Sequence, residues 1–554
     1  MLHIAVLASL AVSSVPTQSP AREPAGEFQD VYWDTLDVDG RLTGGKMQIY
    51  VPSRGSIRET LAAPVTTLTQ SVLPPNDANR VDLVIVGDGY QAAQLPTYAS
   101  QVANIASAFF NKEPYHTYQP LFLVHRIDVV SVDSGVDNDP VQGIQKNTAL
   151  DMGYWCGGTE RALCVDVSKA YQFANNAPDV DLVLALANSS MYGGVGYPSS
   201  DLATSAAGNG SALEIVRHEF GHALGNLADE YDYGGSTTYV GPEPNEANVS
   251  KLTSAQMSAA MTKWFRWIGV NNAAFDGLVS SYEGARYCQF GIYRPTNNSL
   301  MRNLNRPFNL PSAEKLILEI YRIVRPIDDS SPTQTTYGGT ETLFVTPVAP
   351  TGNPLSIQWK LSGVPIPGAT STSLDLSTLA LGQCPVVVSV TATDTTSWVR
   401  DEAARAQFMT ETRDFQVQPG GPTIANYCVT TPNSAGSGAV MASSGSSSVS
   451  ANDLVLQTFG CPPNKTGIYF FSSGQTQVVL GNGFRCVSSP FVRFPAIQTT
   501  EFGDAELALD LDDLPGSQVI QAGDQRYFQL WFRDAPGGGA GTDTSDGLRV
   551  RFCP

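Results

Sequence analysis

Two histidines four residues apart, with an acid directly after the first, form the clearest chemical pattern in the sequence: His218-Glu219-Phe220-Gly221-His222. On a helix this spacing places both imidazoles on one face, one turn apart, where both can bind one metal ion. Glu219 can then act as general base on a water molecule that the metal holds. Because the chain has only five histidines among 554 residues, chance is a poor explanation, and we expect a zinc site.

A catalytic zinc needs three protein ligands and one open position, so a third ligand must join the two histidines. Asp229 and Glu230 follow the motif closely, and either carboxylate could serve once the chain has turned. We favour Asp229 as the third ligand and keep Glu230 as the alternative. The carboxylate that does not bind the metal is expected to orient a ligand histidine through a hydrogen bond.

The residues around the motif favour a helix. Ser211 and Glu214 have the spacing of a capping box, in which two side chains satisfy the first backbone N–H groups. Gly225 is a suitable end for the helix, after which the chain must turn. Apolar residues recur at the helical period along one face, namely Leu213, Val216, Phe220, Ala223, Leu224 and Leu227.

The region before the motif alternates between strand-like and helical patterns. Apolar runs at residues 81–90, 121–130 and 181–188 predict three buried strands, and a helix is expected after the first of them. A later helix, about Ser312–Ile323, closes the region. This alternation predicts an α/β domain over residues 80–328 that contains the motif.

Regions rich in short strands flank this domain. Residues 28–75 predict a small N-terminal β domain. After a linker, alternating strands around Trp359 predict an immunoglobulin-like β-sandwich over residues 340–417. Residues 423–554 predict a second β module that bears cysteines. The expected fold class is therefore multidomain, with one α/β domain flanked by all-β domains.

The charge and the first residues limit the kinds of partner. A formal net charge of −19 argues against nucleic acid and anionic membranes. Residues 1–20 have the short apolar core of a secretory signal peptide, with cleavage between about Ser13 and Ala21; a buried strand is the alternative. Because no later run of about 18 apolar residues exists, we expect a secreted, extracellular protein without a transmembrane anchor.

Eight cysteines fit an oxidising compartment, where disulfide bonds persist. Their spacings are not those of a cysteine zinc site, so we expect disulfides instead. The expected pairs are Cys156–Cys164, Cys461–Cys486 and Cys428–Cys553, which leaves Cys288 and Cys384 without a partner.

An acidic segment is a candidate for a second metal site. Three aspartates, Asp133, Asp137 and Asp139, stand within seven residues, and carboxylates are calcium ligands. Their spacing is not that of an EF-hand loop, so a solvated turn is the alternative. Calcium is therefore a candidate cofactor beside zinc.

Residues of about 80–325 resemble the bacterial immunoglobulin A metalloendopeptidase family, a group related to the metzincin zinc peptidases. The resemblance implies a metzincin-like α/β catalytic domain, and residues 28–75 resemble the N-terminal β domain of the family. Several stretches carry it in the same order, namely VDLVIVGDGY at Val81, SGVD at Ser134, YGG at Tyr192, HEFGHALGNLADEY at His218, KWFRWI at Lys263 and NNSLM at Asn297.

The resemblance implies roles for particular residues. His218 and His222 match the metal ligands of the family, and Glu219 matches its catalytic acid. The metzincin pattern has its third ligand where this chain has Ala228, so the resemblance carries the ligand over only to the following DEY stretch at Asp229. Metzincins also place a methionine turn beneath the metal, and Met301 is the candidate for it.

The expected function is that of a zinc metalloendopeptidase that hydrolyses peptide bonds in a protein or peptide substrate. Glu219 would activate the zinc-bound water, and Tyr231 and Tyr293 are candidates for stabilising the oxyanion. One alternative is an exported adhesin or binding protein with a structural zinc site. Another is a zinc hydrolase of a non-protein amide or ester. The C-terminal modules are candidates for binding a cell surface, a glycan or the substrate.

Overall fold

The structure is a computed structural model that describes residues 26–554, apart from residues 38, 53–56, 58, 69–77 and 233–235. The expected signal peptide at residues 1–20 lies outside the described residues. The chain divides into two compact units, which are not two simple halves of the sequence. The first comprises Met1–Asp328, Val348–Leu355 and Thr393–Thr410, and the second comprises Asp329–Pro347, Ser356–Ala392 and Glu411–Pro554.

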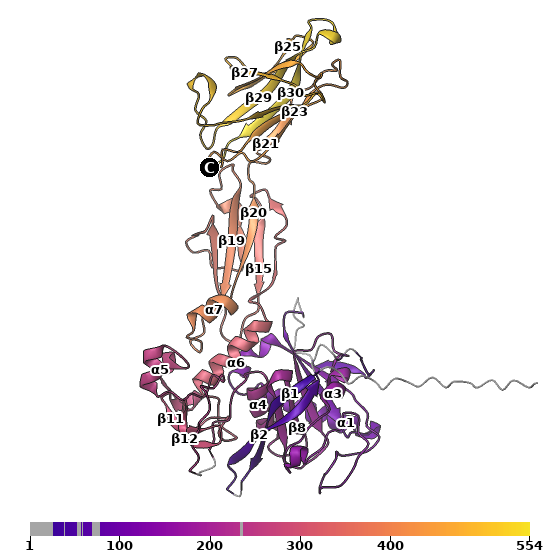
Figure 1. The fold of residues 1–554 in the computed structure, drawn as a ribbon, viewed down its shortest axis with the longest axis vertical. Coiled ribbons are helices and arrows are strands. Elements are labelled where there is room, and N and C mark those ends of the chain that lie inside the picture. The colour runs from indigo at the N-terminus through magenta and orange to yellow at the C-terminus, as the bar shows by residue number, and fades with distance from the viewer. Residues whose placement is uncertain (1–25, 38, 53–56, 58, 69–77, 233–235) are drawn as a thin grey trace, which may run out of the picture. The chain divides into compact units, whose positions relative to one another are not determined.

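An eight-stranded mixed sheet is the centre of the first unit (Figure 1), with the strand order β2-β1-β7-β8-β6-β4-β5-β3. Strand β4 runs parallel to β5 and β6, and β6 runs parallel to β8, whereas the other neighbours are antiparallel. The strands are β1 (Gly26–Leu36), β2 (Leu42–Pro52), β3 (Val65–Leu68), β4 (Val81–Asp88), β5 (Phe122–Ile127), β6 (Leu182–Ala187), β7 (Gly194–Tyr197) and β8 (Leu202–Ala206). The residues expected to form a separate N-terminal β domain thus contribute strands to both edges of this sheet.

Helices cover both faces of the sheet, because its central strands are apolar on both sides. In β4, Leu83 and Ile85 belong to one core cluster and Val84 and Val86 to another, as the two-residue period of a strand requires. The first cluster includes helices α1 (Leu95–Phe109), α4 (Ala212–Ala223) and α6 (Leu310–Ile323), and the second includes α3 (Val167–Ala174). The three strands and the two flanking helices predicted from the sequence are therefore confirmed.

Shorter elements complete the first unit. They are α2 (Tyr115–Tyr118), α5 (Ser254–Ala260), β9 (Asn271–Asn272), β10 (Gly277–Leu278), β11 (Tyr282–Ala285), β12 (Cys288–Arg294) and α7 (Glu402–Phe408). Helix α7 belongs to the segment 393–410, where Asp394 accepts hydrogen bonds from Tyr118 (2.8 Å) and Tyr321 (3.0 Å). No helix of the described residues is long and apolar enough to cross a membrane.

The second unit is built of strands. Its first part has one sheet of order β13-β15-β18 and one of order β14-β20-β19-β16-β17, and the predicted central tryptophan, Trp359, is fully buried. The strands are β13 (Ile327–Ser330), β14 (Thr336–Tyr337), β15 (Thr342–Pro347), β16 (Ser356–Leu361), β17 (Val364–Pro365), β18 (Ser373–Asp375), β19 (Val386–Thr393) and β20 (Thr410–Val417).

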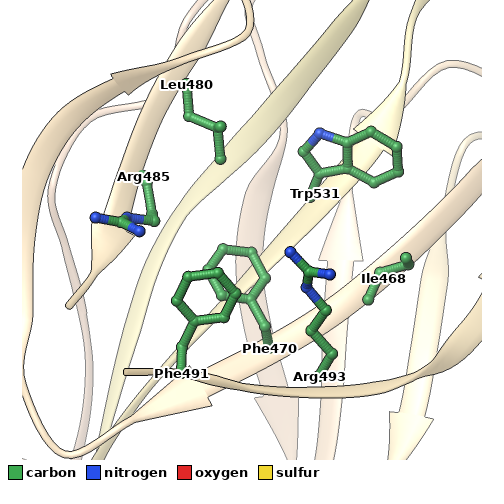
Figure 2. Close-up of a pocket in the computed structure, with 7 residues that line it drawn as sticks. All are labelled: Ile468, Phe470, Leu480, Arg485, Phe491, Arg493 and Trp531. Carbon is green, nitrogen blue, oxygen red and sulfur yellow. The ribbon is translucent and has the colours of Figure 1, made fainter. Parts of the chain in front are cut away.

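The C-terminal part of the second unit is also all β. Its sheets have the orders β21-β30-β29-β24-β27, β22-β23-β28 and β25-β26. The strands are β21 (Ile424–Tyr427), β22 (Val440–Ser444), β23 (Val455–Phe459), β24 (Thr466–Ser472), β25 (Gln475–Leu480), β26 (Gly483–Val487), β27 (Val492–Gln498), β28 (Ala505–Ala508), β29 (Gln525–Arg533) and β30 (Thr542–Arg551). This part carries a groove of about 290 Å³ (Figure 2), in which Arg485 and Arg493 both lie near the ring of Phe491.

The disulfides agree with the sequence only in part. The predicted pair Cys156–Cys164 is confirmed. The other two predicted pairs are wrong, because Cys461 is buried in the apolar core and remains free, while Cys486 lies beside the end of β21. The observed pairs are Cys384–Cys553 and Cys428–Cys486, and Cys288 is the second free cysteine of the described chain.

Candidate metal centre

Helix α4 holds the two motif histidines in the interior of the first unit. All residues from Ile215 to Ala223 are buried, and the predicted apolar face of the helix packs in the core. The predicted capping box is wrong, because the backbone of Ser211 is not extended and its side chain makes no cap. Glu214 instead contacts the guanidinium of Arg217, which is buried and needs a counter-charge.

The chain turns back toward the metal centre directly after α4. The helix ends at Ala223, within two residues of the predicted Gly225, and Asn226 has a left-handed conformation with φ of 45°. The turn brings the carbonyl oxygen of Leu227 to 2.6 Å from Nδ1 of His222. Asp229 follows this turn, so the same bend that ends the helix delivers the predicted third ligand.

Four side chains converge at one point of the first unit. Nε2 of His218 and Nε2 of His222 are 3.2 Å apart, and Oδ1 of Asp229 lies 3.2 Å from the first and 3.4 Å from the second. Oδ2 of Asp34, from β1, lies 2.7 Å from Nε2 of His218. Asp34, His218, His222 and Asp229 form the one group of this kind within the described residues, with all ligand atoms within 4.8 Å of one another.

The hydrogen bonds around these four residues fit a divalent metal. Nδ1 of His218 faces the carbonyl oxygen of Leu300 at 3.0 Å, as Nδ1 of His222 faces that of Leu227. Each Nδ1 must therefore donate its hydrogen, which leaves both Nε2 lone pairs pointing at the centre. Lone pairs and carboxylate oxygens would repel one another there without a cation, and two nitrogens with carboxylate oxygens are ligands that zinc accepts.

Two tyrosines hold the outer oxygens of the carboxylates. The hydroxyl of Tyr231 donates to Oδ1 of Asp34 at 2.6 Å, and the hydroxyl of Tyr287 donates to Oδ2 of Asp229 at 2.5 Å. The inner oxygen of Asp229 accepts no hydrogen bond from the described residues. Each carboxylate is thereby fixed with one oxygen turned to the centre.

The electrostatics also call for positive charge at the centre. Burial lowers the pKa of His218, but the negative charges of Asp34 and Asp229 outweigh it and hold this pKa well above the usual range. Burial raises the pKa of Asp229, but the neighbouring His222 and His218 lower it by more, so this pKa lies below its usual range. Without a cation the site would therefore take up a proton, and a metal ion can replace that proton.

Glu219 lies beside the four residues and is not one of them. It is completely buried, and neither of its carboxylate oxygens accepts a hydrogen bond within the described structure. Burial, followed by the negative charge of Asp34, raises its pKa well above the ordinary value, although His218 opposes this. Strand β7 leaves room for it, because a Cβ on Gly194 would lie 2.8 Å from Oε1.

Glu230, the alternative third ligand, points away from the four residues. Its carboxylate accepts hydrogen bonds from Asn248 (2.9 Å), Ser299 (2.7 Å) and Asn309 (2.8 Å). Its backbone N–H donates to the carbonyl oxygen of Met301 at 2.7 Å. Glu230 thus acts on the histidines only indirectly, by holding the turn whose Leu300 carbonyl accepts from His218.

Met301 and the two predicted tyrosines occupy different surroundings. Met301 is buried against α4, and a Cβ on Gly221 would lie 2.5 Å from its sulfur. The hydroxyl of Tyr231 is engaged with Asp34, and Tyr293 lies in β12, where its backbone pairs with Ser250. The hydroxyl of Tyr192 is buried without a partner among the described residues, close enough to feel the charges of Asp34 and Glu219.

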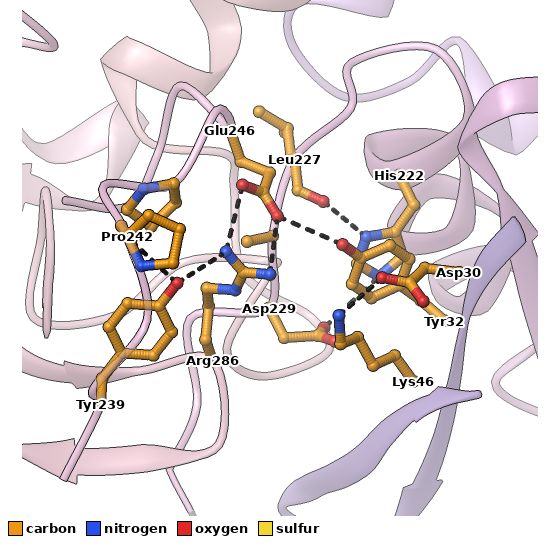
Figure 3. Close-up of polar contacts among 12 residues, drawn as sticks. Asp30, Tyr32, Lys46, His222, Leu227, Asp229, Tyr239, Pro242, Glu246 and Arg286 are labelled. Carbon is orange, nitrogen blue, oxygen red and sulfur yellow. Dashed lines mark hydrogen bonds and ion pairs between the residues drawn. The ribbon is translucent and has the colours of Figure 1, made fainter. Parts of the chain in front are cut away.

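Sequence reasoning missed several residues of the centre. Tyr32, on β1, stacks on the ring of His222 with centroids 4.4 Å apart, and its hydroxyl donates to Glu246 at 3.2 Å (Figure 3). Arg286 pairs with Glu246 at 3.2 Å. Tyr32 and Asp34 stand at alternate positions of β1, so they lie on one side of the strand, but nothing in the sequence linked either of them, or Tyr287, to the histidines.

The three aspartates considered for calcium do not form a comparable group in the described structure. Oδ2 of Asp133 accepts from the backbone N–H of Asn147 at 2.7 Å, and Oδ1 of Asp137 accepts from that of Lys146 at 2.6 Å. These contacts are those of a hydrogen-bonded polar turn.

Comparison with known proteins identifies the region that contains α4. No curated protein matches the chain. Fibronectin(III)-like modules of Clostridium thermocellum CbhA align with 41% of this chain and 94% of their own, at 8% identity and a TM-score of 0.11, which is too low to support an argument. The family model described as IgA Peptidase M64 matches residues 68–274, as the sequence motifs predicted. In its first unit the chain therefore has a domain that is similar to the IgA peptidase M64 family.

Proposed function

We propose that this domain is a secreted, zinc-dependent endopeptidase with a metzincin-like arrangement. The observation that carries the proposal is the convergence of two imidazole nitrogens and the Asp229 carboxylate beside the unpartnered carboxylate of Glu219. A buried carboxylate without donors is costly, so a functional reason is expected. The family supports a peptide bond as the target, and three disulfides support export.

His218, His222 and Asp229 would hold the zinc, with Met301 beneath them. When bound, zinc polarises the scissile carbonyl and makes water easier to deprotonate. Glu219 accepts the proton of the attacking water on a carboxylate oxygen and delivers it to the nitrogen of the leaving amine. The carboxyl of Glu219 holds the proton between the two transfers.

Tyr192 is a better candidate for stabilising the oxyanion than the tyrosines favoured from the sequence. Its hydroxyl is buried and has no partner among the described residues, so it is free to donate to a developing negative charge. Tyr231 already donates to Asp34.

Two other functions predict different results. A binding protein with a structural zinc would need no general base, so the loss of Glu219 would not change its function. A hydrolase of a non-protein amide or ester would use Glu219 but would not cleave unfolded protein. Cleavage of denatured casein by the zinc-loaded chain therefore separates the endopeptidase from the other two functions, and Glu219-dependent hydrolysis of a small amide or ester separates those two from each other.

The experiment compares the full chain with Glu219→Gln and with the matched control Glu319→Gln, whose carboxylate contacts Lys315 on the surface of α6. We expect one zinc in each protein. We expect the unaltered chain to cleave casein, even if slowly. The rate should fall at least about 100-fold in Glu219→Gln, because the proton acceptor is lost. It should stay the same in Glu319→Gln. Measurable cleavage that is the same in Glu219→Gln as in the unaltered chain would refute the proposed mechanism.

A further inference from the structure

Strand β1 brings one more ligand to the centre than a catalytic zinc uses. His218, His222 and Asp229 already supply three protein groups, and a catalytic site keeps its fourth position open. The carboxylate of Asp34 completes the set of four, with Oδ2 at 2.7 Å from Nε2 of His218. A closed set of four protein ligands has no position for a reacting carbonyl or water.

The backbone of β1 lies where an extended peptide would have to lie. It pairs antiparallel with β7 through Tyr32 with Gly196 and Trp33 with Val195. Strand β7 passes directly over α4, since a Cβ on Gly196 would lie 2.8 Å from Cβ of His222 and 3.0 Å from Oε2 of Glu219. Without β1, β7 would be the edge strand beside the proposed general base. Such an edge binds an extended peptide by adding it to the sheet.

Two grooves mark the path of β1 on either side of the metal centre. One, of about 620 Å³, is lined by Asp30 and Tyr32 of β1 together with Arg286. The other, of about 460 Å³, is lined by Asp37 near the end of β1 together with Tyr231. Between them, Asp34 meets His218. The ring of Tyr32 covers that of His222 (Figure 3). The strand therefore runs from one groove to the other through the centre, as a bound substrate would.

We infer that β1 occupies the peptide-binding edge of β7 and that Asp34 takes the open position on the metal, so that this conformation is a latent form. Displacement of the β1–β2 hairpin joins the two grooves into one cleft that an extended peptide can enter. This inference rests on the proposed zinc peptidase function, whose regulation it describes.

The pairing of the hairpin suits movement as one piece. Strands β1 and β2 pair over their whole lengths, from Gly26 with Pro52 to Leu36 with Leu42, whereas β1 and β7 share two residue pairs. Side chains add the hydrogen bonds of Asp34 with Tyr231 and of Tyr32 with Glu246. Leaving the edge of β7 keeps the pairing within the hairpin intact, but it breaks these contacts and uncovers Val31 and Val51, which pack in the core cluster that includes α3.

The test measures access to the metal with a small probe, acetohydroxamate, which binds zinc at an open position. Asp34→Asn has nearly the same volume and keeps an acceptor for Tyr231, but it is a poor metal ligand. The control, Asp39→Asn, alters an exposed carboxylate in the turn of the same hairpin, where its partner is Arg41. If no more than about a tenth of the molecules are in the open form, Asp34→Asn should bind the probe at least about tenfold more tightly than the unaltered chain does. Asp39→Asn should bind the probe with the same affinity as the unaltered chain.

The outcomes separate this inference from the proposed function. Equal probe affinity in the unaltered chain and Asp34→Asn would overturn the latent form. Loss of zinc from Asp34→Asn would also overturn it, since Asp34 would then be needed to hold the metal. Tighter probe binding by Asp34→Asn without casein cleavage would support the latent form and refute the peptidase function. Tyr231→Phe, which removes only the hydroxyl that fixes Asp34, should also bind the probe more tightly. If Asp34→Asn fails to fold, the probe affinity of Tyr231→Phe tests the latent form in its place, and an unchanged affinity would overturn it.

Discussion

At the scale of single residues, the direction of each hydrogen bond determines what the centre can bind. Backbone carbonyls of Leu300 and Leu227 take the Nδ1 hydrogens of the two histidines, so both Nε2 atoms are left as acceptors. Glu230 supports one of these carbonyls from behind, because it binds both Ser299 and the backbone of Met301. A residue that touches neither the metal nor the substrate can therefore influence metal affinity.

Glu230→Gln tests this support. A neutral amide cannot accept from Asn248, Ser299 and Asn309 together, so we expect the turn to shift and zinc affinity to fall about 10- to 100-fold, as for other groups that orient metal ligands. Competition with a chelator measures the affinity. Glu314→Gln is the matched control, because its carboxylate also accepts three hydrogen bonds, from Trp267, Arg400 and Asp401. Zinc affinity unchanged in Glu230→Gln would contradict the role assigned to the turn.

At the scale of elements, the fit between β7 and α4 places Glu219 in a space that only glycine leaves open. Gly194 and Gly196 face the helix, and any side chain there would meet Glu219 or His222 within about 3 Å. The strand is therefore a covering layer of the centre as well as a member of the sheet.

Gly196→Ala should disturb this layer. Its Cβ would lie 2.8 Å from Cβ of His222, so strand or helix must move, at a cost of about 1–3 kcal/mol in unfolding free energy. We expect zinc affinity to fall with stability, measured by denaturant unfolding and by chelator competition. Gly210→Ala has open space around its Cβ and should change stability by no more than about 0.5 kcal/mol. Equal stability of the two variants would show that β7 is not tightly fitted to α4.

Elements of this site differ in how far sequence could predict them. Helix α4 and β4 were predictable because their apolar periods are local, and His218 and His222 because four residues on a helix fix their geometry. Asp34 was not, because it meets His218 only after β1 pairs with β7. The capping box failed for a related reason, since Glu214 is taken by a buried arginine that no local pattern reveals.

At the scale of the whole molecule, the two units depend on different stabilising features. The first unit has large apolar clusters on both faces of its sheet, and the metal centre lies within it. The second unit contains two of the three disulfides, and the pair Cys384–Cys553 closes a loop with a sequence separation of 169. A long closed loop restricts the unfolded chain strongly, so this disulfide should matter for the second unit and little for the metal centre.

The double variant Cys384→Ser with Cys553→Ser tests this separation. We expect unfolding of the second unit to become easier by about 2–5 kcal/mol, seen as a lower midpoint of its transition in calorimetry. Zinc content should stay the same, because all four residues of the metal centre lie in the first unit. Cys288→Ser is the control, since Cys288 is free and belongs to the first unit. If the double variant lost its zinc while Cys288→Ser kept it, the centre would depend on the second unit, and the peptidase domain could not be treated as self-sufficient.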